Sequence, residues 1–159
     1  MNSSRRKMLQ GSGGLAVLGL AIAAGLVKPG NAWAQQAGWN KAAFDTKSLN
    51  DAVKALGGTT PTESKDIQFL NTPDIAENGA VVPFTIVSKL PKTEQIALLV
   101  EKNPNILAAN FTIPEGTEPW INTRAKMGQT SNVIALVKAD GKYYYTAKEV
   151  KVTLGGCGG

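Results

Sequence analysis

Alternating hydrophobic and polar residues dominate the chain after Gly58 and predict a protein built mainly from β-strands. Turns rich in Asn, Gly and Pro separate the alternating runs. Gln95–Glu101 shows the pattern well, because Ile96, Leu98 and Val100 fall on one face. The pattern predicts strands over residues 66–70, 80–90, 95–101, 108–113, 121–127, 132–139 and 142–154.

Three local signals refine these strands. Pro83 predicts an edge strand or a bulge, because proline cannot donate a ladder hydrogen bond. Asp140-Gly141 predicts a hairpin turn, because both residues tolerate positive φ. The three consecutive tyrosines of the last strand place aromatic rings on both of its faces. We expect Tyr144 in the core, and Tyr143 and Tyr145 raise the hypothesis of an interface.

One amphipathic helix is predicted before the strands, from Ser48 to Leu56. Its apolar residues recur at i, i+3, i+4 and i+7, namely at Leu49, Ala52, Val53 and Leu56. Ser48 caps the start and Gly57 the end. We expect this helix to cover an edge or an end of the sheet, and residues 35–47 to form a loose lead-in.

These elements predict an immunoglobulin-like, antiparallel β-sandwich with a short N-terminal helix and a flexible C-terminal arm. The sandwich is expected over residues 35–154 and the arm over residues 155–159. A single cysteine excludes the disulfide that joins the sheets of antibody domains. The last strand would run directly into the arm, so a rigid strand would hold its root.

Residues 1–34 are predicted to be an export signal that is cleaved. Ser4–Gln10 reads as a twin-arginine motif through Arg5 and Arg6. An uncharged stretch follows, and Ala32-Trp33-Ala34 provides a small-x-small cleavage site at Ala32 and Ala34. The alternative is a membrane anchor, for which the uncharged stretch is short and weakly apolar. We therefore expect a periplasmic protein without stable membrane insertion, exported folded and assembled with a partner.

The charge of the exported chain is almost balanced. The whole chain has 17 basic and 12 acidic residues, and four of the basic residues lie in residues 1–34, which contain no acid. This leaves 13 basic against 12 acidic residues. Nucleic-acid binding needs a basic face, so the composition favours no nucleic-acid partner.

The residue inventory excludes most self-contained chemistry. The chain has no histidine and one cysteine. Histidine-dependent nucleophilic catalysis, ordinary zinc and haem sites, iron–sulfur clusters and C-x-x-C redox pairs are therefore excluded, and we expect no metal site, no catalytic residue and no cofactor. What remains is the nucleophilic sulfur of Cys157.

Cys157 lies two residues before the C-terminus, between Gly155-Gly156 and Gly158-Gly159. Glycines carry no Cβ, so this segment can enter a cleft too narrow for an ordinary loop. Five extended residues span roughly 17 Å. We interpret the segment as a swinging arm that presents a group, bound covalently to Cys157, to active sites on other proteins.

The Gly155–Gly159 end resembles the GGCGG terminus of the SoxY family, the sulfur carriers of the periplasmic Sox (sulfur-oxidising) system. Further stretches similar to that family are 63–67, 73–79, 99–104 and 150–154. The resemblance implies that thiosulfate and derived sulfane or sulfonate groups are carried on Cys157. It also implies a heterodimer with a SoxZ-like subunit. Transient partners would be a c-type haem enzyme that conjugates thiosulfate, a manganese hydrolase that releases sulfate and a sulfane dehydrogenase.

Three other interpretations of this terminus stay open at the level of sequence. The protein could be an exported structural β-sandwich module that forms an intermolecular disulfide through Cys157. It could be a thiocarboxylate carrier activated at Gly158-Gly159, although that activation needs ATP and the export signal argues against it. A prenyl anchor needs three residues after the cysteine, and only two follow.

Overall fold

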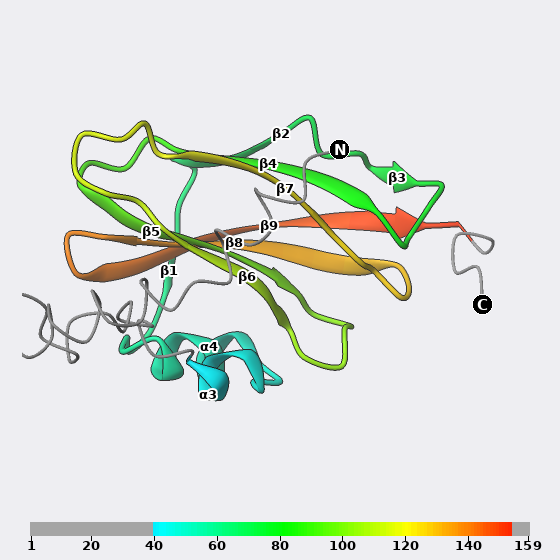
Figure 1. The fold of residues 1–159 in the computed structure, drawn as a ribbon, viewed down its shortest axis with the longest axis horizontal. Coiled ribbons are helices and arrows are strands. Elements are labelled where there is room, and N and C mark those ends of the chain that lie inside the picture. The colour runs from blue at the N-terminus through cyan, green and yellow to red at the C-terminus, as the bar shows by residue number, and fades with distance from the viewer. Residues whose placement is uncertain (1–39, 154–159) are drawn as a thin grey trace, which may run out of the picture. The chain divides into compact units, whose positions relative to one another are not determined.

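The computed structural model describes residues 40–153 as two short helices and nine strands (Figure 1). Within this range the helices lie on one side of a larger sheet and a three-stranded sheet lies on its other side. No helix of the described residues has the length and apolar character needed to cross a membrane. The elements are α3 Lys41–Phe44, α4 Leu49–Ala55, β1 Thr62–Glu63, β2 Ile67–Leu70, β3 Ile75–Ala76, β4 Val82–Ser88, β5 Thr93–Val100, β6 Leu107–Thr112, β7 Trp120–Ala125, β8 Ser131–Ala139 and β9 Lys142–Val152.

The predicted β-sandwich is confirmed. The larger sheet has the order β1-β9-β8-β5-β6, and β3 also pairs with β9. The smaller sheet has the order β2-β4-β7. All neighbouring strands of four or more residues pair antiparallel. The two-residue strands pair parallel to β9, β1 at its start and β3 at its end.

The main core lies between the two sheets. Ile96, Leu98 and Val100 of β5 all point into it, as their alternation predicts. The intervening Ala97 and Leu99 are also buried, because the helices cover the other face of the larger sheet. Central strands buried on both faces read as continuous apolar runs, which explains the sequence of β5.

The helix predicted over residues 48–56 is confirmed as α4. The Ser48 hydroxyl accepts a hydrogen bond from the Asp51 amide at 3.1 Å, and Gly57 ends the helix with φ of 88°. Its predicted position at an edge or end of the sheet is wrong. Ala52 and Val53 instead pack against the face of the larger sheet, because that face is itself apolar and is buried by the helix.

The lead-in predicted over residues 35–47 contains a helical turn at Lys41–Phe44 that periodicity missed. Asn40 stabilises this helical turn with two side-chain hydrogen bonds, one within the turn and one to α4. Its side-chain oxygen accepts a hydrogen bond from the Ala43 amide at 3.1 Å, and its amide nitrogen donates to the carbonyl of Ala55 at 2.9 Å. Four residues are too few to show a helical period, so a contact with α4 decides this turn.

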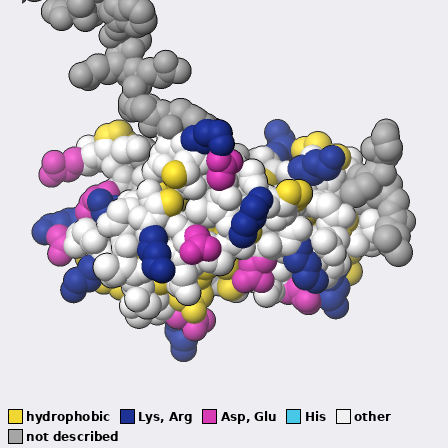
Figure 2. All heavy atoms as spheres, turned by 90° about the horizontal axis from the view of Figure 1, so that it is seen from below, with side chains coloured by type: hydrophobic (Ala, Val, Ile, Leu, Met, Phe, Trp, Pro, Cys, Tyr) yellow, Lys and Arg dark blue, Asp and Glu magenta, His cyan; other side chains and the backbone are white. Residues whose placement is uncertain are grey.

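The outer side of the helical layer is charged. Figure 2 shows basic and acidic side chains interspersed on this face. Among them, the exposed Lys41 pairs with Asp45 one helical turn away. Apolar side chains of α3 and α4 face the sheet, so this layer buries its hydrophobic stripe within the described residues.

The hairpin predicted at Asp140-Gly141 is confirmed. The two residues have φ of 48° and 75°, and they join Ala139 of β8 to Lys142 of β9. The edge-strand or bulge prediction for Pro83 is wrong, because β4 is the central strand of the smaller sheet. The proline is tolerated there because pairing with β2 stops at Thr85, so nothing on that side needs a donor from Pro83.

Tyr143 lies in the fold and not at an interface, which corrects the hypothesis made for it. The residue is only 4% exposed and packs with α4, and its hydroxyl donates a hydrogen bond to the carbonyl of Leu56 at 2.8 Å. Tyr145 lies half-buried against the same helical cluster, and Tyr144 packs against the core between the sheets as expected. The helical layer therefore decides the place of Tyr143 and Tyr145, whereas the core between the sheets decides that of Tyr144.

Replacing Tyr143 by phenylalanine is expected to lower the free energy of unfolding by about 1 kcal/mol, because the Leu56 carbonyl loses its donor. Burial raises the pKa of the Tyr143 hydroxyl. Its contribution is therefore complete below the unfolded pKa of about 10 and is lost as the pH rises through the folded value. Urea unfolding at pH 7 and 11 measures both effects. Tyr145→Phe is the matched control, and equal losses in the two variants would contradict the prediction.

Candidate functional site at the root of the cysteine segment

The predicted carrier residue Cys157 and its flanking Gly155, Gly156, Gly158 and Gly159 lie outside the described residues. The predicted export residues Arg5, Arg6, Ala32 and Ala34 also lie outside them. The structure bears on the site through the end of β9, which leads into residues 154–159. We call these residues the cysteine segment and the end of β9 its root. The last described residue, Thr153, precedes Cys157 by four positions.

The backbone of β9 is hydrogen-bonded on both sides up to this last residue. On the β8 side, the amide of Val152 donates to the Thr130 hydroxyl at 3.0 Å. On the β3 side, the amide of Lys151 donates to the carbonyl of Asp74 at 2.9 Å and that of Thr153 to the carbonyl of Ala76 at 3.1 Å. The root of the segment is therefore positioned by an interior strand and not by a free edge (Figure 1).

Side chains hold the same segment. Val150 is fully buried in the core between the sheets, and Val152 packs against it. Lys148 binds the crossing chain between β2 and β3: its ammonium donates to the carbonyl of Thr72 at 2.6 Å and pairs with the Asp74 carboxylate at 2.9 Å. These contacts attach β3 to β9 although only two residues of β3 form the ladder.

Gly79 makes a close approach that no other residue type would allow. A Cβ at this position would lie 2.5 Å from the carbonyl oxygen of Met127 and 2.8 Å from Cγ1 of Val152. The carbonyl of Gly79 also accepts a hydrogen bond from the Met127 amide at 2.7 Å. Gly79 therefore lets the loop before β4 close over the last residues of β9.

We expect Gly79→Ala to lower the free energy of unfolding by about 1–3 kcal/mol, because the added methyl displaces Met127 or Val152. The loosening should be largest at the root, so amide exchange of Val152 and Thr153 should accelerate more than that of Val133 in the core. Gly128→Ala is the matched control, since a Cβ there meets nothing within 4 Å. Similar destabilisation by both substitutions would show that the steric argument is wrong.

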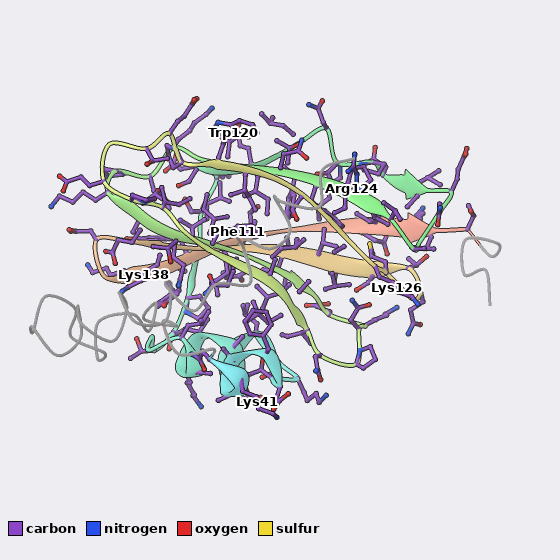
Figure 3. The ribbon with its side chains drawn as sticks, in the orientation of Figure 1. Lys41, Phe111, Trp120, Arg124, Lys126 and Lys138 are labelled. Atoms are coloured by element: carbon purple, nitrogen blue, oxygen red, sulfur yellow. The ribbon has the colours of Figure 1, made fainter. Side chains whose placement is uncertain are left out.

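Charges of both signs lie at this end of the sandwich. Arg124 and Lys126 are exposed at the end of β7 (Figure 3), and Glu77 and Lys151 are exposed beside the root. Within residues 40–153 none of these four forms an ion pair, and no group of three or more acidic, histidine or cysteine side chains is placed to hold a metal ion. The described residues thus hold the strand that precedes the cysteine segment, and they contain no such metal-holding group.

A cavity lies at the other end of β9. It has a volume of about 300 Å³ and is lined by Gly57, Gly58, Thr59, Thr60, Thr62 and the hairpin residues Gly141, Lys142, Tyr143 and Tyr144. These residues flank the first residues of β9, whereas the root of the cysteine segment is the last. The cavity therefore does not belong to the candidate site.

Sequence reasoning missed the residues that hold the root. No pattern in the sequence assigns a role in holding the end of β9 to Asp74, Gly79, Thr130 or Lys148. A two-residue strand such as β3 has no periodicity to detect, and hydroxyl or carbonyl partners leave no pattern. The family resemblance of the stretch 73–79 is the one sequence signal for this part of the site.

The described residues form a β-sandwich whose last strand is hydrogen-bonded up to the point where the cysteine-containing segment begins. The family model "SoxY: Sulfur oxidation protein SoxY" matches residues 52–157, a range that includes Cys157. The chain belongs to the SoxY family. Proteins of this family are sulfur carriers of sulfur oxidation, generally non-catalytic, that act with the other proteins of the Sox system and are typically periplasmic.

A solved structure agrees with the family. The sulfur carrier protein SoxY from Chlorobium limicola f thiosulfatophilum is 37% identical, with a TM-score of 0.60, over 67% of this chain and 96% of that one. A superoxide reductase (neelaredoxin) from Ignicoccus hospitalis is 16% identical, with a TM-score of 0.48, over 57% of this chain and 82% of that one, a likeness that carries no argument. The comparison with curated proteins found no match.

Proposed function

We propose that this protein carries thiosulfate and the sulfane and sulfonate groups derived from it as covalent adducts of Cys157. The observation that carries the proposal is the hydrogen-bonded end of β9, which holds Thr153 four residues before the only cysteine. Family membership supports the sulfur chemistry. A firmly held root followed by a glycine-rich terminus is what a short presenting arm requires.

The proposed chemistry balances with partner enzymes. Joining the Cys157 thiol to the sulfane sulfur of thiosulfate forms an S–S bond and releases two electrons, which a c-type haem enzyme accepts, and the thiol proton. Hydrolysis of the cysteine S-thiosulfonate then breaks the bond between the two outer sulfurs. Water supplies the oxygen of the departing sulfate, and a persulfide stays on Cys157. A manganese hydrolase is the proposed catalyst. A sulfane dehydrogenase would oxidise the persulfide anion to a cysteine S-sulfonate, with three oxygens supplied by water, six electrons accepted by the dehydrogenase and six protons released.

Activation of the thiol is expected to come from these partners. The nearest cation in the sequence is Lys151, six residues before Cys157, so no adjacent cationic side chain favours the thiolate. A group carrier leaves the demanding chemistry to other proteins. We therefore assign Cys157 as the attachment point and not as a catalytic residue.

Export and assembly complete the proposal. The twin-arginine motif at Arg5 and Arg6 and the cleavage site at Ala32 and Ala34 would deliver the folded chain to the periplasm. A SoxZ-like subunit would be exported with it as a heterodimer. The family's usual location supports this route.

Intact-mass spectrometry of the mature protein from the periplasm, before and after reduction, tests the proposal. Reducible additions on Cys157 that match sulfane, sulfonate or thiosulfonate groups are expected. A free thiol that stays unmodified with thiosulfate and the other periplasmic Sox proteins would overturn it. Disulfide-linked dimers alone would favour the structural module instead.

A further inference from the structure

The short distance between Thr153 and Cys157 limits how an enzyme can reach the cysteine. Four extended residues span at most roughly 14 Å at about 3.3–3.6 Å each. If the reacting centre of an enzyme is recessed in a cleft, its rim must therefore come close to the residues around Thr153. This step rests on the proposed carrier function.

Residues 74–81, which we call the root collar, lie immediately beside Thr153. The carbonyls of Asp74 and Ala76 accept hydrogen bonds from β9, and the carbonyl of Glu77 accepts one from the Thr153 hydroxyl at 3.4 Å. The carbonyl of Gly79 binds the loop after β7. The root collar is thus held on two sides, and Figure 1 shows its strand β3 alongside the end of β9.

The root collar exposes two branched aliphatic side chains. Ile75 is 58% exposed and Val81 is 53% exposed. Ala76 faces the core, so strand alternation turns Ile75 outward. The outer side of the helical layer, in contrast, carries basic and acidic side chains scattered among uncharged atoms (Figure 2). Stiff β-branched side chains on a held backbone lose little entropy when a partner covers them.

The root collar also carries an acidic side chain that is not paired within the described residues. Within the described residues, Asp74 is paired with Lys148, whereas the exposed carboxylate of Glu77 has no ion pair. A partner surface that covers Ile75 and Val81 would place its own groups next to Glu77. A cation there would complement the carboxylate.

We propose that the root collar is the docking surface for enzymes that act on the Cys157-bound group. Its occupant is the rim of the enzyme's active-site cleft, apolar opposite Ile75 and Val81 and basic opposite Glu77. The arm supplies the reacting sulfur, and the root collar supplies the contact that holds the cleft in place while the sulfur reacts.

The test uses the full heterodimeric carrier, loaded on Cys157 with thiosulfate, and the purified hydrolase that releases sulfate from it. The double variant Ile75→Ser/Val81→Ser should raise the KM for the carrier about tenfold and leave kcat within about twofold. Trp120→Ser is the matched control, because Trp120 is 47% exposed on β7, outside the root collar (Figure 3). Reaction of the free thiol with a small disulfide reagent should be the same in all variants.

A longer arm provides a second, independent readout. Four glycines inserted between Thr153 and Leu154 would let the sulfur reach the centre while the rim stays away from the root collar. In this background the double variant should change KM less than about threefold. An undiminished effect in the longer arm would overturn the docking geometry.

The remaining outcomes separate this inference from the function on which it rests. A KM for the double variant equal to that of Trp120→Ser would overturn docking at the root collar and leave the carrier function intact. Loss of the second subunit from the double variant in gel filtration would also overturn it, because the root collar would then be a subunit interface. If the loaded parent carrier releases no sulfate, the carrier function is wrong and the docking proposal falls with it.

Discussion

Cys157→Ser is expected to reduce sulfur carriage to background while the fold stays intact. The hydroxyl of serine forms no S–S bond to thiosulfate, and the chain has no other thiol to replace it. The described core contains no part of the cysteine segment, so the free energy of unfolding should change by less than about 0.5 kcal/mol. Thiosulfate turnover with the complete set of periplasmic enzymes and urea unfolding of the purified variant measure the two effects.

Deletion of Gly159 is the matched control for the serine variant. It removes the terminal Gly-Gly carboxylate that a thiocarboxylate carrier would need, and it keeps Cys157. A cysteine carrier should retain part of its turnover after this deletion. Normal thiosulfate turnover in Cys157→Ser, or complete loss in the Gly159 deletion with normal turnover in the serine variant, would refute the assignment of the attachment point.

Bulky residues beside the cysteine should have the second-largest effect. In Gly156→Trp and Gly158→Trp, an indole replaces a hydrogen atom on the strip of backbone that must enter the cleft. Misplacement of a reacting atom by about 1 Å is enough to cost on the order of 10²-fold in rate, so kcat/KM with the partner enzymes should fall by about this factor. Stopped-flow or steady-state assays with each purified enzyme measure the loss.

Alanine at the same two positions is the control for size. Gly156→Ala and Gly158→Ala should lose much less activity than the tryptophan variants, and all four should unfold like the parent. The thiol should still react with a small disulfide reagent, because only the entry of the arm into a cleft is obstructed. If the tryptophan variants react normally with every partner enzyme, the narrow-cleft interpretation is wrong.

The long strands of the fold were predictable because their signals are local. The residues of β5 and the Asp140-Gly141 turn carry their structure in alternation and in tolerance of positive φ. The cap of α4 at Ser48 is equally local. Such signals need no knowledge of which other segment lies nearby.

The failed predictions all depend on contacts between distant segments. Pro83 lies in a central strand, and proline is tolerated there because β2 ends before reaching it. Tyr143 is buried because α4 covers its face of the larger sheet, and the turn at Lys41–Phe44 depends on Asn40 reaching Ala55. Each outcome is set by tertiary packing, which overrides the local preference of the residue.

The chemistry proposed for the site follows from the sequence, whereas the residues that hold the site in place are known only from the structure. The sequence by itself determined that the only thiol lies between two pairs of glycines, that no histidine is present and that a strand precedes the glycines. Only the tertiary structure decided that β3, Gly79 and Lys148 hold that strand to its end, and that Ile75 and Val81 stand exposed beside it. The reason is physical: the reactivity of a residue is carried by its side chain, whereas its place is decided by the segments that pack around it.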